Sequence, residues 1–185
     1  MSMVRMLLQI FCTGVVSLAA QERVNPDAAK IGDFSKRVAD YVKVHQAAKS
    51  KLSSLKSTNS PAVIAHHEHE LARQIREARG PQQPGNIFTL EISQEFRRLL
   101  AIAMQGKEAE HIRESLRHAE PVRSHPLRVD GEYPEGVPLQ STPPSLLLNL
   151  PSLPPEVEYR IVGHDLILRD VGANLVVDFL ANAIS

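Results

Sequence analysis

Histidine and glutamate residues crowd together at residues 66–70, which read His-His-Glu-His-Glu. His66 and His69 are three residues apart, and His66 and Glu70 are four apart. On a helix, side chains at these spacings share one face. Neutral imidazoles and a carboxylate suit Zn²⁺, Ni²⁺ or Cu²⁺. His66, His69 and Glu70 are therefore candidate ligands for a divalent transition metal.

A second element would have to complete such a site, because one helix rarely supplies a full set of ligands. His111, Glu114 and His118 have a similar helical spacing and could be that element. The competing interpretation is that both groups lie on the solvated polar faces of their helices. In that case no metal or other cofactor is bound.

The sequence contains no strong catalytic motif. It has no G-x-S-x-G turn, no phosphate-binding glycine loop and no H-E-x-x-H helix. Asp165, Asp170 and Asp178 lie near one another in the sequence, but turn and edge chemistry explains them better than a catalytic pair. A hydrolytic enzyme has no specific support, so the sequence favours a non-enzymatic protein.

An apolar seam runs along the helix expected after Asn25, an N-cap that Pro26 follows at the first helical position. The seam repeats every three to four residues, as in a coiled coil. Its members are Ile31, Phe34, Val38, Tyr41, Leu52 and Leu55. His45 occupies one seam position as a tolerated polar residue that could set register. The seam needs a cover, either the next helix or, alternatively, a protein partner or second copy of the chain.

Two further helices are expected in a helical region at residues 25–120. The second starts after Ser60-Pro61 and ends at Gly80-Pro81, so its short connection to the first predicts an antiparallel hairpin. The third starts at Thr89, is interrupted near Gly106 and then resumes.

The last part of the chain changes character. A proline-rich connecting segment at residues 121–156 excludes long helices. Residues 157–185 then predict a small β unit, with Gly163-His164 as a type II′ hairpin turn and a second turn at residues 171–174. Leu175, Val177 and Phe179 should share one face of a third strand, or that segment is a short helix. The expected fold class is α+β, a helical hairpin and interrupted third helix followed by a three-stranded antiparallel meander.

Several stretches of residues 85–185 carry a resemblance. They include Gly85-Asn-Ile-Phe-Thr, Glu95-Phe-Arg-Arg-Leu-Leu, Pro134-Glu-Gly-Val-Pro-Leu and the run from Leu153 to Phe179. Together they resemble a group of short exported bacterial proteins of unknown function. The terminal strands are also similar, more loosely, to the C-terminal piece of periplasmic nickel and cobalt homeostasis proteins. The first resemblance implies export and the second brings no metal residues.

The start of the chain has the pattern of a secretory signal peptide. Arg5 is followed by an apolar run and then by Ser17-Leu-Ala19, which suits cleavage after Ala19. We therefore expect a signal peptide at residues 1–19 and a periplasmic or extracellular protein. An uncleaved membrane anchor is the alternative, although the run is shorter than the ~20 residues that span a bilayer.

Composition narrows the function of the mature chain. Its charges nearly cancel, because the whole chain has 21 basic and 21 acidic residues. A nucleic-acid partner would need a basic surface, so none is expected. Cys12 is the only cysteine and lies in the signal, which excludes disulfides and thiolate metal sites from the mature chain. The sequence thus predicts an exported protein that acts through protein contacts or self-association at the seam, with periplasmic divalent-metal binding as the alternative.

Overall fold

A computed structural model describes residues 26–55, 57–105, 109–118, 127–133 and 142–184 of the chain. Its helices are α1 (Pro26–Lys49), α2 (Pro61–Arg79), α3 (Leu90–Ala103), α4 (Ala109–His118) and the short α5 (Pro144–Leu147). The strands β1 (Val157–Val162), β2 (Asp165–Asp170) and β3 (Leu175–Leu180) form one antiparallel sheet in that order. The expected α+β fold is confirmed. The expected signal peptide lies outside the described residues.

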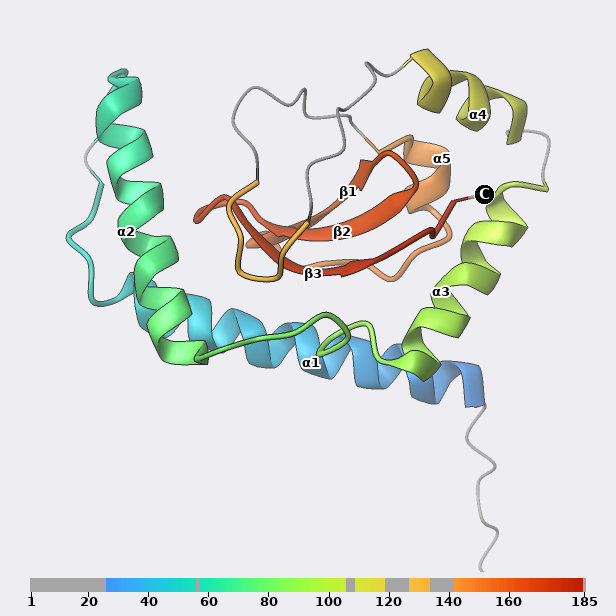
Figure 1. Ribbon diagram of the computed structural model, residues 1–185, viewed down its shortest axis with the longest axis horizontal. Coiled ribbons are helices and arrows are strands. Elements are labelled where there is room, and N and C mark those ends of the chain that lie inside the picture. The colour runs from blue at the N-terminus through green and yellow to red at the C-terminus, as the bar shows by residue number, and fades with distance from the viewer. Residues whose placement is uncertain (1–25, 56, 106–108, 119–126, 134–141, 185) are drawn as a thin grey trace, which may run out of the picture.

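One hydrophobic core joins the helical part to the sheet. The buried face of α1 contributes Phe34, Val38 and Tyr41, and the same core includes residues of α2, α3 and all three strands. Figure 1 shows α1 running beneath the sheet, with α2 at one end and α3 at the other. Most of the predicted seam is therefore covered by the same chain.

Aromatic rings fill the part of this core between α1 and α3. The ring centroids of Phe34 and Phe96 are 4.7 Å apart, and those of Phe88 and Phe96 are 5.1 Å apart in an edge-on arrangement. Such tilted pairs are the favoured geometries for aromatic contacts. They hold the N-terminal half of α1 against α3.

The predicted pair of N-terminal helices is present, and the structure refines how they pack. Figure 1 shows α2 standing across the C-terminal part of α1 and forming a corner with it, so the two helices do not lie side by side along their lengths. Leu71, Ala72 and Ile75 in the second half of α2 are buried, whereas Val63 and Ile64 in its first half are exposed. The core therefore covers only the part of α2 that meets α1.

The interrupted third helix is confirmed as α3 and α4. Thr89 caps α3, since its side chain accepts a hydrogen bond from the backbone N–H of Ile92. The predicted strands are also confirmed. Gly163 has a positive φ of 61°, whereas His164 is not among the residues with positive φ, as a type II′ turn requires.

The third strand differs from its prediction because β3 contains an irregularity. Leu168 pairs with Asp178, but the next residue of β2 pairs with Val176, which leaves Val177 without a partner. A bulge of this kind turns two successive side chains to one face. Val177 lies in the main core, whereas Phe179 packs on the opposite face of the sheet. The expectation that Phe179 shares a face with Val177 is therefore wrong.

The bulge directs the fully buried side chain of Asp178 toward the loop before α3. Its carboxylate accepts hydrogen bonds from the backbone N–H groups of Gly85 (3.0 Å), Ile87 (2.7 Å) and Phe88 (2.9 Å). A buried carboxylate is tolerated when hydrogen bonds satisfy it in this way. Asp178 thereby fixes the loop from which α3 starts.

Substituting Asp178→Asn should lower the free energy of unfolding by about 2–4 kcal/mol, because an amide group offers one acceptor oxygen and turns an N–H donor toward other donors. Urea denaturation would measure the change. Asp165→Asn is the matched control, since Asp165 accepts a bond only from the exposed N–H of Asn182. Equal losses in the two variants would contradict this role for Asp178.

Candidate functional site

The candidate metal ligands on α2 are engaged with different neighbours. Arg73 binds the carboxylate of Glu70 through two hydrogen bonds and, as the largest cause, lowers its pKa to about 2. His69 lies 3.3 Å from a carboxylate oxygen of Glu132, and His66 is exposed. The three side chains thus share a helix without converging on one point.

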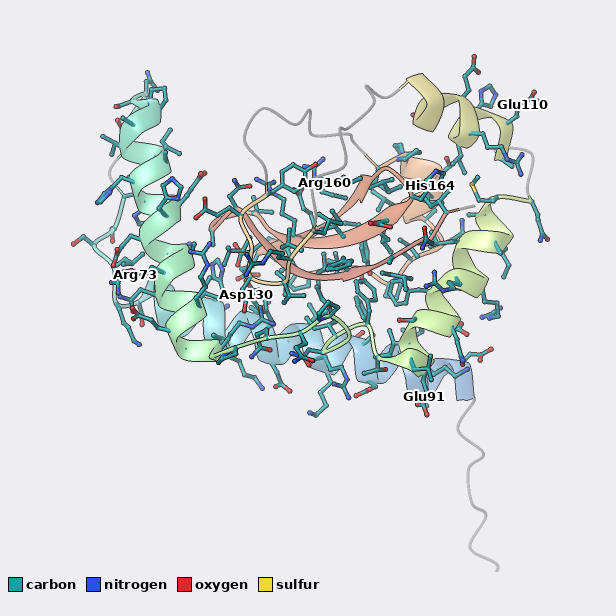
Figure 2. The ribbon with its side chains drawn as sticks, in the orientation of Figure 1. Arg73, Glu91, Glu110, Asp130, Arg160 and His164 are labelled. Atoms are coloured by element: carbon teal, nitrogen blue, oxygen red, sulfur yellow. The ribbon has the colours of Figure 1, made fainter. Side chains whose placement is uncertain are left out.

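The second predicted element cannot reach them. In Figure 1, α4 lies at the opposite end of the sheet from α2, and Figure 2 shows Arg73 and Glu110 far apart on these two helices. His111 and Glu114 are exposed residues of α4, and the side chain of His118 lies outside the described residues. Across the described residues, no three His, Cys, Asp or Glu side chains are grouped to hold a metal ion.

The predicted interaction seam divides into two parts. Phe34, Val38 and Tyr41 are at most 5% exposed, so they cannot contact another molecule. Ile31 is partly buried against the same core. Leu52 and Leu55 follow the end of α1 and line a surface hollow of about 480 Å³, which we call the corner hollow because it lies between α1 and α2.

A buried polar cluster stands beside this hollow. The carboxylate of Asp170, at the end of β2, is fully buried. One of its oxygens accepts a hydrogen bond from the hydroxyl of Tyr41 (2.6 Å) and lies 2.6 Å from Nδ1 of His45. Its other oxygen accepts from the backbone N–H of Ala173 (2.8 Å). The cluster joins α1 to the turn between β2 and β3.

The surroundings of Asp170 determine which groups of the cluster donate hydrogen bonds. Burial, followed by the negative charge of Asp170, raises the pKa of Tyr41 well above its usual value, so the phenol keeps its proton and donates. A carboxylate has no proton to give, so Nδ1 of His45 must also donate. His45 is 3% exposed and lines the corner hollow. Its second ring nitrogen, Nε2, remains for other contacts.

A second hollow, of about 610 Å³, lies between α5 and β1, and we call it the α5–β1 groove. Residues from both faces of β1 line it: Tyr159 belongs to the core beneath the sheet, whereas Arg160 lies on the other side in Figure 2. The groove therefore opens onto the outer edge of the strand. Leu147 and Leu148 also line it and are 38% and 87% exposed.

Some backbone groups on the outer edge of β1 have no partner among the described residues. Val162 and Asp165 flank a two-residue turn and form a hydrogen-bonded pair. Hydrogen-bonded and non-hydrogen-bonded pairs alternate along an antiparallel ladder, so every second residue before Val162 also bonds to β2. Tyr159 and Ile161 then direct their N–H and C=O groups outward, although Ile161 is fully buried. The hydroxyl of Thr142 donates to the C=O of Tyr159, and no other described group pairs with the outward groups of these two residues.

Comparisons with known proteins found no match. No family model fits the chain, and neither a curated protein nor a solved structure is similar to it at the level required for significance. The resemblance to short exported proteins stays a prediction.

Sequence reasoning found His45 and Asp170 separately and missed their contact. His45 had a signal, since it interrupts an otherwise apolar seam, and a buried histidine needs a polar partner. The α5–β1 groove had a weaker signal in the leucines at residues 146–148. Neither feature of the sequence identifies the residues that His45 or these leucines contact in the fold.

Replacing Tyr41→Phe should lower the free energy of unfolding by about 1.5–3 kcal/mol, because it removes a hydrogen bond to a buried charge. Tyr159→Phe is the control, since the hydroxyl of Tyr159 donates only to the neutral C=O of Pro151 (3.0 Å). Thermal or urea unfolding of both variants compares the two bonds. A larger loss for Tyr159→Phe would contradict a charged Asp170.

Proposed function

We propose that this chain is an exported, non-enzymatic protein that acts through contacts with a protein partner. In this proposal the contact site is the α5–β1 groove, where an extended segment of the partner adds a fourth strand beside β1. The observation that supports it most is an apolar groove placed along a strand edge, where the N–H of Tyr159 has no partner among the described residues. This arrangement is typical of sites that bind peptides by strand addition.

The backbone of β1 selects an extended partner. The N–H of Tyr159 can pair with a neighbouring strand, which gives affinity without regard to the side chains of the partner. An α-helix satisfies its own backbone groups and cannot use this edge. The partner segment is therefore extended where it contacts β1.

The groove supplies specificity for an apolar side chain. Leu148 is 87% exposed, which is unusual for a leucine that also lines a groove, and burying it would remove its apolar surface from water. Leu147, Leu150, Leu153 and Val157 also line the groove. Alternate side chains of an added strand point to one face. We expect an aliphatic or aromatic residue of the partner to enter here.

Two guanidinium groups share one carboxylate beside the groove, whose lining includes Glu158 and Arg160. Glu158 binds Arg160 through two hydrogen bonds of 2.7 Å and Arg169 through one of 2.6 Å. One carboxylate neutralises only one of the two guanidinium groups. An acidic residue of the partner, placed one strand position from its apolar anchor, would complement the remaining charge.

Selection of peptides from a displayed random library, followed by affinity measurements, tests the site. The selected peptides should carry an apolar anchor near an acidic residue. Leu148→Asp should weaken their binding at least about tenfold, since it places a charge where apolar surface is buried.

Two controls distinguish strand addition from nonspecific hydrophobic binding. Leu90→Asp changes a leucine of α3 that is 76% exposed, comparable to Leu148, and should leave the affinity unchanged. Methylating single backbone nitrogens of a selected peptide should abolish binding at alternate positions only. Binding that withstands methylation at every position, or that depends on Leu90 and ignores Leu148, would contradict the proposal.

Export is tested by expressing the complete chain in a Gram-negative bacterium. Periplasmic extracts should contain a protein whose N-terminus is Ala20, because the small residues Ser17 and Ala19 suit the cleavage site. Mass spectrometry of the intact protein reads the terminus. A full-length chain in the cytoplasm would contradict export.

A further inference from the structure

The corner hollow has the size and lining of a small-molecule site, and nothing in the proposed function uses it. Its volume of about 480 Å³ lies within the roughly 300–1,000 Å³ of such sites. Leu52, Leu55, Ile64 and Leu71 form an apolar wall. Leu55 and Ile64 are 43% and 37% exposed, so the wall is open to an incoming molecule.

His45 places one polar atom, Nε2, at this apolar wall. Its Nδ1 is committed to Asp170, and no described residue forms a hydrogen bond with its Nε2. The turn after β2 packs against the ring: a Cβ atom added at Gly172 would lie 3.3 Å from its Cε1. The ring is thus held in place while Nε2 has no hydrogen-bond partner among the described residues, so a ligand in the hollow can pair with it.

The remaining polar groups of the hollow are mostly hydrogen-bond donors. Lys49, Ser53, Ser54 and His67 can each donate, whereas Glu68 can only accept when ionised. Lys49 also brings a positive charge from the last turn of α1. This set suits a ligand group that accepts hydrogen bonds and carries a negative charge.

We propose that the corner hollow binds an aliphatic carboxylate, whose chain lies along the leucines and whose carboxylate accepts a hydrogen bond from Nε2 of His45. The ring carries a proton on both nitrogens in this complex. Asp170 stabilises the resulting imidazolium through Nδ1, as a buried carboxylate does for histidine in other sites, and the ligand stabilises it through Nε2. The other titratable groups that face the ring are Tyr41 beside Asp170, Lys49 on α1, and His67 and Glu68 on α2.

Calorimetry with octanoate and octanol tests this site in the mature chain. The two probes share a chain and differ in the group that meets His45. Octanoate should bind about 10- to 100-fold more tightly than octanol, the difference expected for one charge-assisted hydrogen bond. His45→Asn should remove that preference, because its amide can still donate to Asp170 but has no atom in the place of Nε2.

Two further measurements test whether octanoate binds at the corner hollow. Leu148→Asp, which disables the α5–β1 groove, should leave octanoate binding unchanged, so failure of one site is distinguishable from failure of the other. In the unsubstituted protein, octanoate should shift the ¹⁵N resonance of Nε2 of His45 and leave the ring of His164, at the other end of β2, unaffected. This reading does not depend on the folding of the His45→Asn variant.

Three results would overturn the proposal. The first is the absence of octanoate binding at millimolar concentration. The second is equal affinity for octanoate and octanol. The third is an octanoate affinity that His45→Asn does not change, or a resonance of His45 that octanoate does not move.

Discussion

The burial of one face of α1 is the constraint on which the rest of the structure depends. Phe34, Val38 and Tyr41 need cover along most of the helix, and α2, α3 and the sheet each supply part of it. Two buried carboxylates fix this arrangement. Asp170 binds side chains of α1, and Asp178 binds the backbone of the loop that leads into α3. A buried charge tolerates few alternative partners, so these contacts specify how the helices meet the sheet.

Both hollows occur where this burial stops. The corner hollow lies where α1 ends and the first half of α2 extends past the core, which leaves Leu55 and Ile64 without a cover. The α5–β1 groove lies at the outer edge of the sheet, along β1. In both places apolar surface adjoins polar groups whose positions the core determines. Such surfaces can bind a second molecule without a change of fold.

Local patterns in the sequence predicted most of the elements. Pro61 and Thr89 mark the starts of α2 and α3, and Gly163 predicts the β1–β2 turn, because each acts on its own neighbours. What depends on distant residues could not be predicted. His45 and Asp170 are 125 residues apart, and the bulge in β3 appears only when Asp178 meets the loop before α3. The pairing of Glu70 with Arg73 could not be predicted either, since spacing along a helix does not show which neighbour binds a carboxylate.

The central claim is that a partner pairs with the backbone of β1, and amide hydrogen exchange measures this most directly. The protein would be examined alone and with a saturating concentration of a selected peptide. Strand addition predicts that the amide of Tyr159 exchanges more slowly with the peptide, while that of Arg160, already bonded to β2, changes least along the strand. Unchanged exchange at Tyr159 in the saturated complex would contradict the account.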